Sequence, residues 1–583
     1  MAETLLSPGV LARENDQSFI GSAPLIFGAA IIGPAVKGPV GIPTPVSSFS
    51  QYEAIFGGAV ESGSQFYTYL NSVSAQNYFS QGGESLLVTR VVSGSFSSAV
   101  TSGSAAGANN SGIVSRDFST NAKTSFQLET ISEGIIMNNW SSSDAADGTL
   151  KNGTSDNLRW EINSVNTSSG QFSLLIRRGN DTTNQKAILE TYSNLSLDPT
   201  AANYISKVIG NTFRTVELDG TDYFVKTNGE YVNRSAYVRI SEVNLPTPNY
   251  LNNDGSAKIQ YTGSLPAIGS GSFASATGNN ISIAQCKFNE NIDINNIQGL
   301  KASDYTSSIQ LLSNKDDYNF NVVSAPGLIH SLHPTATKML VTLAETRQDC
   351  ISVIDLVPYN SGVNVVIGAS SAFNTSYSAT YWPWLQSIDA STAQTVWSPA
   401  SVFIPGVYAF TDASSDPWFA PAGLIRGSLG SVIRAERKLT AGNRDVLYGA
   451  NINPIASFPG SGTVVFGQKT LQKTASALDR INVRRLLISL KGYISQVSDN
   501  LVFEQNTIAT RNQFLSQVNP YLESVQQRQG LFAFKVVMDS TNNTSEVIDR
   551  NELVGQIFLQ PTRTAEFIIL DFNVLPTGVV FPS

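Results

Sequence analysis

Ile-Asn-Val-Arg-Arg-Leu-Leu, residues 481–487, lies in the C-terminal segment that decides the fold of this chain. It follows Gly-Ser-Gly-Thr-Val-Val-Phe-Gly (460–467), and after it come Leu-Val-Phe-Glu-Gln-Asn (501–506) and Thr-Ala-Glu-Phe-Ile-Ile-Leu-Asp-Phe (564–572). In chain order, these stretches predict a strand, a helix that begins at an arginine pair, a short strand, a longer helix, a hairpin and a terminal strand.

The first of these helices, predicted over 484–498, has one apolar face. Its apolar residues stand at 486, 487, 490, 494 and 497, a spacing that predicts a face buried in a core. Arg484 and Arg485 stand at its start, where the helix dipole disfavours an exposed cation by about 0.3–1 kcal/mol. We therefore expect the pair either to contact carboxylates or to meet a partner. A solvated helix end is the alternative.

The second helix is predicted to begin at Asn506 or Thr507 as N-cap and to stop at Gly530. Pro520 is expected to kink or divide this helix, with Asn519 as a second cap. Strands are predicted after it at Phe532–Met538, Leu553–Leu559 and Glu566–Phe572.

The rest of the chain changes composition twice. At 583 residues it is too long for one compact core. Residues 21–92 and those after 318 alternate strand and helix patterns, which predicts a partly parallel sheet, whereas the stretch between them is rich in Ser, Gly, Asn and Thr. We predict an α+β multidomain protein with an N-terminal arm at 1–20, an αβ core domain at 21–92 plus 316–450, a β-rich outer insertion at 93–315, a C-terminal αβ domain at 451–565 and a C-terminal strand or arm at 566–583.

Several local elements follow from the same patterns. Ala23–Ile32 is predicted as a strand, Ser50 and Gly57 as the ends of a short helix, Tyr67–Gln81 and His333–Arg347 as helices, and Gly269–Gly278 as a flexible loop. Further strands are predicted at Leu86–Val92, Ser125–Ile131, Leu158–Val165, Phe172–Ile176, Tyr237–Ile240, Phe320–Ala325 and Cys350–Val357.

Charge and composition argue against several classes of protein. The net charge is −8, and no run of Lys or Arg is longer than a pair, so nucleic-acid binding through a basic face is disfavoured. No stretch reaches the roughly 18 apolar residues of a membrane span, and the first residues lack the pattern of a signal peptide. Cys286 and Cys350 are the only cysteines, so we expect buried thiols and no disulfide framework.

No catalytic motif stands out. The chain has neither a Gly-x-Ser-x-Gly elbow nor a phosphate loop. His330 and His333 are three residues apart, with Asp349 and Asp355 further along, but this spacing supplies no defined third ligand. We expect a strand-to-helix loop with histidines at the helix cap. No metal and no cofactor is predicted.

A series of short motifs carries a family resemblance. The motifs are, in order, Ser7-Pro-Gly-Val10, Gly33-Pro34, Gly38-Pro-Val40, Phe56-Gly-Gly58, Gly82-Gly83, Arg90-Val-Val92, Ser324-Ala-Pro-Gly327, Tyr381-Trp-Pro-Trp384, Ser398-Pro-Ala-Ser401, Pro405-Gly-Val-Tyr408 and Pro417-Trp-Phe-Ala-Pro-Ala-Gly423. Their shared order, together with the C-terminal segment, resembles the contractile tail sheath proteins of myovirus tails and related injection machines. The resemblance covers residues 1–92 and about 318–583, and it leaves the insertion without a landmark.

The resemblance implies a structural subunit rather than an enzyme. Such a subunit polymerises helically around a tail tube in the virion, after assembly in the host cytoplasm, and contracts to drive the tube through the host envelope. Its partners would be copies of itself, the tail tube protein, and baseplate and tail terminator proteins, with no nucleic acid and no membrane.

The resemblance also implies two sets of contact residues. In the family, extended arms add strands to a neighbour's C-terminal sheet, a use of unpaired sheet edges. The candidate arm residues are Leu5, Leu6, Ser7, Pro8, Gly9, Val10, Phe567, Ile568, Ile569, Leu570 and Phe572. The candidate tube-facing residues are Arg511, Gln513, Gln517, Glu523, Gln526, Gln527 and Arg528. A purely solvated polar helix face is the alternative for the second set.

Two other classes stay open on sequence grounds. One is a β-rich adhesion or carbohydrate-binding protein, in which residues 93–315 are the functional part; it predicts a monomer or small closed oligomer with ligand affinity. The other is a hydrolase without a known motif; it predicts an activity that depends on a few carboxylates. A sheath subunit instead predicts tubes that form with rising protein concentration.

Overall fold

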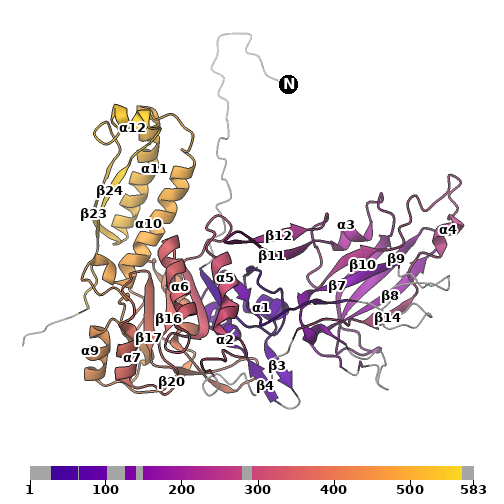
Figure 1. Cartoon of the computed structure of the whole chain (residues 1–583), viewed down its shortest axis with the longest axis horizontal. Helices are drawn as coiled ribbons and strands as arrows, with labels where there is room; N and C mark the ends of the chain where they lie inside the picture. Colours follow the sequence, from indigo (N-terminus) through magenta and orange to yellow (C-terminus); the bar gives the residue numbers. More distant parts are fainter. Residues whose placement is uncertain are drawn as a thin grey trace, which may run out of the picture.

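Figure 1 shows three bodies: a central α/β core, a tall C-terminal unit of helices and a hairpin, and a β-rich insertion that projects from the opposite side of the core. The computed structural model describes residues 28–62, 65–100, 125–139, 149–150, 152–278 and 292–566. The predicted arm at 1–20 and the candidate arm residues from 567 onward lie outside the described residues.

The core is built on one eight-stranded sheet. Its strands are, in spatial order, β2 (Thr44–Val46), β5 (Leu86–Arg90), β1 (Ala29–Gly33), β15 (Val322–Ile329), β16 (Ile351–Asp355), β17 (Ser378–Trp382), β21 (Asn453–Phe458) and β22 (Gly462–Val465). All neighbours pair in parallel except at the two edges, where β2 and β22 run antiparallel. The predicted partly parallel sheet is confirmed.

Helices cover both faces of this sheet, which explains why β1, β5, β15, β16 and β17 are buried along their whole length. Ile31 points into one core cluster and Ile32 into the other, as the two-residue period of a strand requires. The first face carries α1 (Phe49–Phe56), α2 (Leu70–Ser80), η4 (Ala400–Val402) and α8 (Ile404–Ser414), and the second carries η3 (Ala302–Tyr305), α5 (Thr306–Leu311), α6 (Pro334–Arg347), α7 (Val363–Ser370) and α9 (Ala441–Gly449).

Two predicted helix starts need correction. The N-cap of α1 is Ser48, whose side chain accepts a hydrogen bond from the Gln51 backbone N–H, so the prediction of Ser50 is wrong by two residues. Gly57 is confirmed as the end, with a φ of 76°. α2 begins at Leu70 rather than Tyr67, because the residues before it form the hairpin of β3 (Ala59–Ser62) and β4 (Gln65–Thr68).

The insertion has its own core, formed between two sheets. One sheet is β10 (Ile188–Ser196), β9 (Gln171–Arg178), β8 (Leu158–Asn166) and β14 (Gly269–Ser272), and the other is β13 (Val238–Val243), β7 (Phe126–Glu133) and β6 (Ser98–Val100). Between them in sequence lie α3 (Ile205–Ile209), the hairpin β11 (Phe213–Asp219) with β12 (Asp222–Asn228), and α4 (Ile259–Thr262). The four strands predicted inside this region are confirmed within a few residues.

The predicted flexible loop at Gly269–Gly278 is wrong in its first half. Gly269–Ser272 is strand β14, which pairs with β8. Gly271 lies directly on the indole of Trp160, since a Cβ atom there would stand 2.4 Å from the ring. A sequence of Gly and Ser therefore forms a strand here because only a residue without a side chain fits against the tryptophan.

The chain returns to the core earlier than its composition indicates. Ile297, Leu300, Tyr305 and Ile309 are buried in the cluster that packs α6 on the sheet, not in the core of the insertion. The sequence-based boundary at residue 315 therefore lies too far along the chain. The hairpin β11–β12 reaches back from the insertion to α5 (Figure 1).

Arg347, at the end of α6, holds the segment between α5 and β15 in place. Its guanidinium is buried and donates hydrogen bonds to the carbonyl oxygens of Leu312 (2.6 Å), Asn314 (3.0 Å) and Tyr318 (2.6 Å). It also pairs with the Asp349 carboxylate at 2.8 Å. A single side chain thus satisfies three carbonyls of the segment that connects α5 to β15.

Asp355, at the end of β16, gives a testable consequence of burial. Burial raises its pKa to about 7, against the effect of two hydrogen bonds from Ser401. A folded pKa above the unfolded value of about 3.9 means that the native state holds the proton more tightly, so stability falls as pH rises from about 4 to about 7. We expect Asp355→Asn to abolish this loss, which approaches 1.4 kcal/mol per pH unit at its steepest. Urea unfolding at pH 5 and pH 8 checks this; an equal difference between variant and wild type at both pH values would contradict it.

Candidate assembly surfaces

The C-terminal unit has a hydrophobic core separate from those of the sheet. It consists of α10 (Ile481–Asp499), α11 (Ile508–Gln527), the hairpin β23 (Leu531–Val537) with β24 (Gln556–Pro561), and α12 (Ser545–Asp549), and the short η5 (Ala477–Asp479) leads into it. A third small sheet, β19 (Thr395–Ser398), β18 (Leu385–Ile388) and β20 (Val432–Ala435), lies in the core domain. The predicted order of helix, helix and hairpin is confirmed, and Thr507 is the N-cap of α11.

The stretch Leu501–Asn506, predicted as a strand, is a turn between the two helices. Phe503 adopts a left-handed backbone with φ 70°, and its side chain is fully exposed. A β-branched and aromatic sequence forms a turn here because α10 and α11 pack against each other and leave only a short connection.

The arginine pair at the start of α10 is buried, which excludes the solvated helix end. Arg485 donates to both carboxylate oxygens of Asp412 on α8, at 2.6 and 2.5 Å. Arg484 donates to the Ser376 hydroxyl and stacks over the Tyr377 ring at 4.0 Å. The pair therefore fastens the C-terminal unit to the core.

α11 has one buried and one exposed face. Phe514, Val518, Leu522 and Val525 are buried in the unit's core. Among the candidate tube-facing residues, the exposed ones are Gln513, Gln517, Glu523, Gln526, Gln527 and Arg528. Arg511 is not on this surface: it is buried and its Nε donates to Asn506 at 2.9 Å, so its assignment as tube-facing is wrong. Arg528 is already engaged, with an ion pair to Asp416 at 2.7 Å.

Pro520 lies inside α11 and on its exposed face, where sequence reasoning predicted a kink or a break. The structure has one helix that continues through it, so the predicted division and the second cap at Asn519 are wrong. The carbonyl of Ser516 has no backbone donor four residues on, but it lies on the exposed face, where water is available.

Pro520→Ala is therefore expected to stabilise the unit by about 1–2 kcal/mol. An interior proline costs about 3 kcal/mol relative to alanine, and the stiffer unfolded chain offsets about 1 kcal/mol of that. Slower hydrogen exchange of α11 amides would support this, with Asn512→Ala on the same face as the control. Faster exchange would show that the proline fits this helix without cost.

The hairpin β23–β24 has two unpaired edges among the described residues, because its sheet contains only these two strands. Its inner face packs on α11 through Phe534, Ile557 and Leu559. Its outer side carries Phe532 and Phe558, which are 75% and 57% exposed. An unpaired edge beside exposed aromatic rings is a surface on which another strand can add.

Glu566, the last described residue, closes the C-terminal unit at its base. Its carboxylate accepts hydrogen bonds from Tyr448 Oη (2.8 Å), Gln468 Nε2 (2.9 Å) and Arg480 Nε (2.7 Å). Arg480 is the N-cap residue of α10, so this ion pair joins the chain's entry into the unit to its exit. We name these four residues the clasp.

The clasp gives a pH-dependent prediction. Burial alone would raise the pKa of Glu566, but hydrogen bonds from Arg480, Gln468 and Tyr448 outweigh it and hold the pKa below its usual value. This stabilisation is present above the unfolded pKa of about 4.3 and is lost as pH falls through the lower folded pKa. Glu566→Gln should therefore destabilise the unit by about 1–2 kcal/mol at pH 7 and much less below about pH 4. Urea unfolding at both pH values tests this, with Glu546→Gln, at an exposed ion pair, as the control.

The described residues give little support for a metal or catalytic centre. No group of three or more His, Cys, Asp or Glu side chains among them is arranged to hold a metal. His333 is the N-cap residue of α6, as expected, and its ring contacts the Ile329 N–H and the Asp293 carbonyl. Cys350 is buried, and Cys286 lies outside the described residues.

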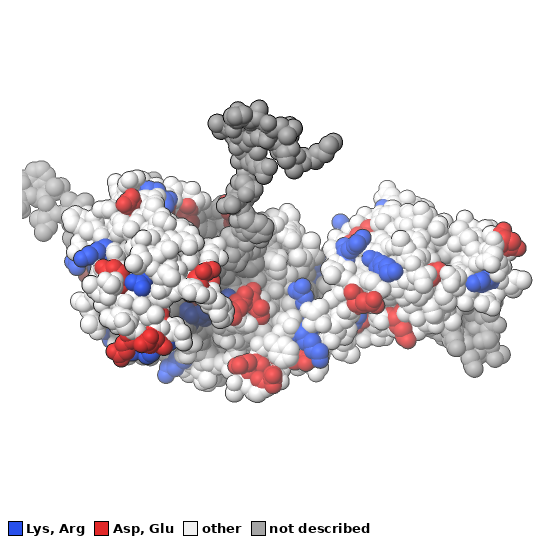
Figure 2. Space-filling model, turned by 90° about the horizontal axis from the view of Figure 1, so that it is seen from above, with Lys and Arg blue, Asp and Glu red and all other residues white. Residues whose placement is uncertain are grey.

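Charge is dispersed on the face of the molecule that is seen from above. On the face shown in Figure 2, blue and red side chains are interspersed and most of the surface is uncharged. Within the described ranges, no helix combines the length and the apolar character that crossing a bilayer demands.

Comparison with known proteins is consistent with this architecture. Residues 296–471 match the model of the phage tail sheath protein central domain, and residues 473–575 match that of the phage tail sheath C-terminal domain. The tail sheath protein of Vibrio phage KVP40 is 33% identical over 305 residues, which cover 48% of this chain and 46% of that protein. The tail sheath protein of Enterobacteria phage T4 is 33% identical over 264 residues, which cover 42% and 40%. The match thus spans less than half the length of these relatives.

A solved structure extends the likeness in fold to the rest of the chain. The sheath tail protein Lin1278 from Listeria innocua aligns with a TM-score of 0.51 and 10% identity, over 92% of this chain and 96% of that one. The relatives that match in sequence are tail sheath proteins, which are structural proteins and not enzymes. The sequence of residues 296–471 and 473–575 is thus similar to the two domains of phage tail sheath proteins.

Proposed function

We propose that this chain is the structural subunit of a contractile phage tail sheath. Copies polymerise helically around the tail tube, and the polymer shortens to drive the tube through the host envelope. The observation that carries the proposal is the C-terminal unit: it matches the sheath C-terminal domain, and its hairpin β23–β24 has both edges unpaired among the described residues.

The unpaired edges suit strand addition by neighbouring subunits. Residues 1–20 and 566–583 are the proposed arms, with Leu5, Leu6 and Val10 in the first and Phe567–Leu570 and Phe572 in the second. Main-chain hydrogen bonds to an edge hold regardless of how the rigid cores are oriented. Arms of this kind keep subunits connected while the cores slide, and one repeated non-closing contact generates a helix.

The exposed face of α11 is the proposed tube contact. Gln513, Gln517, Glu523 and Gln527 lie on it, and their uncharged amides and single carboxylate suit a contact that must slide rather than grip. The further partners we propose are baseplate and tail terminator proteins at the two ends of the polymer, with assembly in the host cytoplasm.

Truncation tests the proposal. Full-length protein should form species that sediment far faster than a monomer as its concentration rises, and a chain lacking residues 1–20 or 567–583 should stay monomeric. Circular dichroism of each truncated chain checks that the core still folds. Equal sedimentation of all three as folded monomers would contradict arm-driven assembly and would favour the insertion as a binding module.

A further inference from the structure

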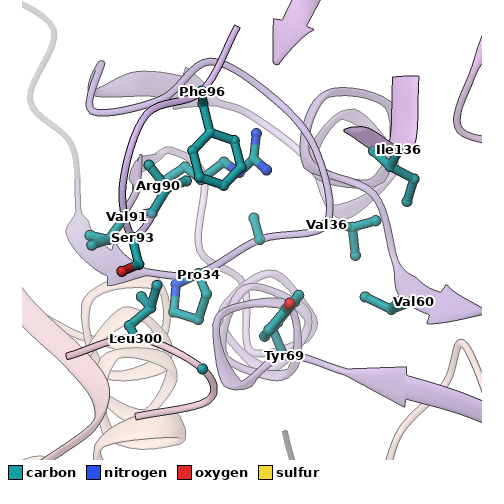
Figure 3. A pocket seen from close by; sticks show the side chains of 13 residues that line it. Pro34, Val36, Val60, Tyr69, Arg90, Val91, Ser93, Phe96, Ile136 and Leu300 are labelled. Carbon is teal, nitrogen blue, oxygen red and sulfur yellow. The ribbon is translucent and has the colours of Figure 1, made fainter. Parts of the chain in front are cut away.

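A cavity of about 240 Å³ lies where the α/β core meets the insertion (Figure 3). The segments that follow β1 and β5 line it, together with Ile136 of η1 (Ile135–Met137) and Leu300. In open parallel sheets, ligands bind outside the carboxyl ends of the strands where the strand order reverses. The strand order reverses at β1. Along the chain β5 follows β1 and pairs on one side of it, and β15, the parallel strand that comes after β5, pairs on the other side.

Arg90, the last residue of β5, brings a positive charge to this cavity. It is 4% exposed, and its Nη1 donates to the carbonyl oxygens of Gly38 (2.6 Å) and Glu133 (3.0 Å). Its Nε has no hydrogen-bond partner among the described residues. The Glu133 carboxylate is engaged elsewhere, since it accepts from the Val40 backbone N–H at 2.9 Å. Within the part of the chain that the structure describes, Arg90 forms no ion pair.

A buried guanidinium without a direct ion pair is costly, by several kcal/mol for an ion of this kind, and the nearby Glu133 charge offsets only part of that cost. Burial lowers the pKa of Arg90 to about 10, partly offset by Tyr69 and Glu133, so the group is still cationic at neutral pH. Carbonyl contacts to Nη1 satisfy part of its hydrogen-bonding capacity but supply no countercharge. Arg90 therefore lacks a directly contacting anion, and an anion in the cavity that it lines would supply one.

The walls indicate which anion fits. Pro34, Val36 and Val60 are apolar, and the Phe96 ring lies 5.6 Å from the guanidinium. In Figure 3, the Tyr69 hydroxyl faces the cavity from the side opposite Arg90. A phosphate dianion would need several cationic or N–H donors, whereas one planar guanidinium matches one carboxylate. The volume exceeds the roughly 150 Å³ that holds benzene in an apolar protein cavity.

We propose that this cavity binds a carboxylate carried on a short apolar body, with the Arg90 guanidinium as its anchor. The same chemistry is available from a free organic acid and from an acidic side chain of a second copy of the chain. The proposal does not depend on the sheath function, because it concerns the cavity within one subunit.

Calorimetric titration of the full-length monomer with sodium benzoate tests the proposal, with benzamide as the uncharged isostere. We expect saturable one-to-one binding of benzoate and at least tenfold weaker binding of benzamide. Arg90→Gln should weaken benzoate binding at least tenfold. Arg434 is an exposed arginine in another sheet, so Arg434→Gln should leave benzoate binding unchanged. Val60 is half-buried on β3, so Val60→Phe should fill the cavity. It should weaken benzoate binding as much as Arg90→Gln does, although Arg90 itself is unchanged.

Absence of saturable benzoate binding, or binding unchanged in Val60→Phe, would overturn the proposal. If Arg90→Gln does not fold, Val60→Phe and the benzamide comparison still decide the outcome. Repeating the titration on the polymerised protein distinguishes a free organic acid from an acidic side chain of a second copy of the chain. Retained benzoate binding supports a free acid, and blocked binding supports a carboxylate from a neighbouring subunit.

Discussion

Arg347→Met is expected to lower the free energy of unfolding of the α/β core by about 3–5 kcal/mol. The substitution removes the guanidinium that donates to the carbonyls of Leu312, Asn314 and Tyr318. The Leu312 carbonyl is buried, and leaving such a group without a donor costs about 1–3 kcal/mol, whereas the Asn314 carbonyl still accepts from the Tyr318 N–H at 3.3 Å. It also removes the stacking of the guanidinium over Phe320 at 4.3 Å.

Hydrogen exchange of β15 and β16 measures this loss in a chain too large for a single two-state transition. Arg347→Lys keeps the charge but lacks the planar fork, so it should recover only part of the stability. Arg550→Ala, an arginine with two exposed ion pairs, is the control and should change stability by under about 1 kcal/mol. Equal effects of Arg347→Met and Arg550→Ala would contradict the role of Arg347 as an organiser of the core.

Leu522→Ala is expected to unfold the C-terminal unit selectively. Leu522 is fully buried in the core of that unit, and a cavity of this kind costs about 2–5 kcal/mol. Because this core is separate from those of the sheet, amides of α11 and β23 should exchange much faster while those of β15 keep their protection. Polymerisation should be lost along with the unit, although the rest of the subunit stays folded.

Asn512→Ala, on the exposed face of the same helix, is the matched control and should leave both exchange and polymerisation unchanged. Uniform loss of protection through the sheet in Leu522→Ala would show that the C-terminal unit and the core fold as one. Full polymerisation of a variant with an unfolded unit would remove that unit from the assembly mechanism.

Sequence patterns were sufficient where local signals and burial agree. α6 follows its cap at His333, and β16 is a short, mainly apolar run that is buried along its whole length, as expected of a strand covered on both faces. The α10 face was predicted for the same reason: Leu486, Leu490 and Val497 repeat at helical spacing and are buried.

The patterns failed where distant contacts override local preference. β14 is a strand of Gly and Ser because Gly271 admits the Trp160 ring, a contact between residues more than a hundred positions apart. α11 passes through Pro520 because packing of its buried face outweighs one missing backbone hydrogen bond.

Among the site residues, too, some follow from local sequence signals and others depend on contacts between distant parts of the chain. Helical spacing separates the exposed Gln513 and Gln517 from the buried Phe514 and Val518, and it also puts Arg511 on the buried side, so this signal was available in the sequence. The clasp carries no such signal. Tyr448, Gln468, Arg480 and Glu566 are dispersed over more than a hundred residues, and only the fold brings them together.

Electron microscopy of the purified full-length chain, alone and mixed with tail tube protein, tests the central claim most directly. The sheath account predicts tubes or stacked rings with a helical repeat, and it predicts monomers when residues 1–20 are removed. Monodisperse particles from the full chain under both conditions would contradict the claim that this protein is built to polymerise.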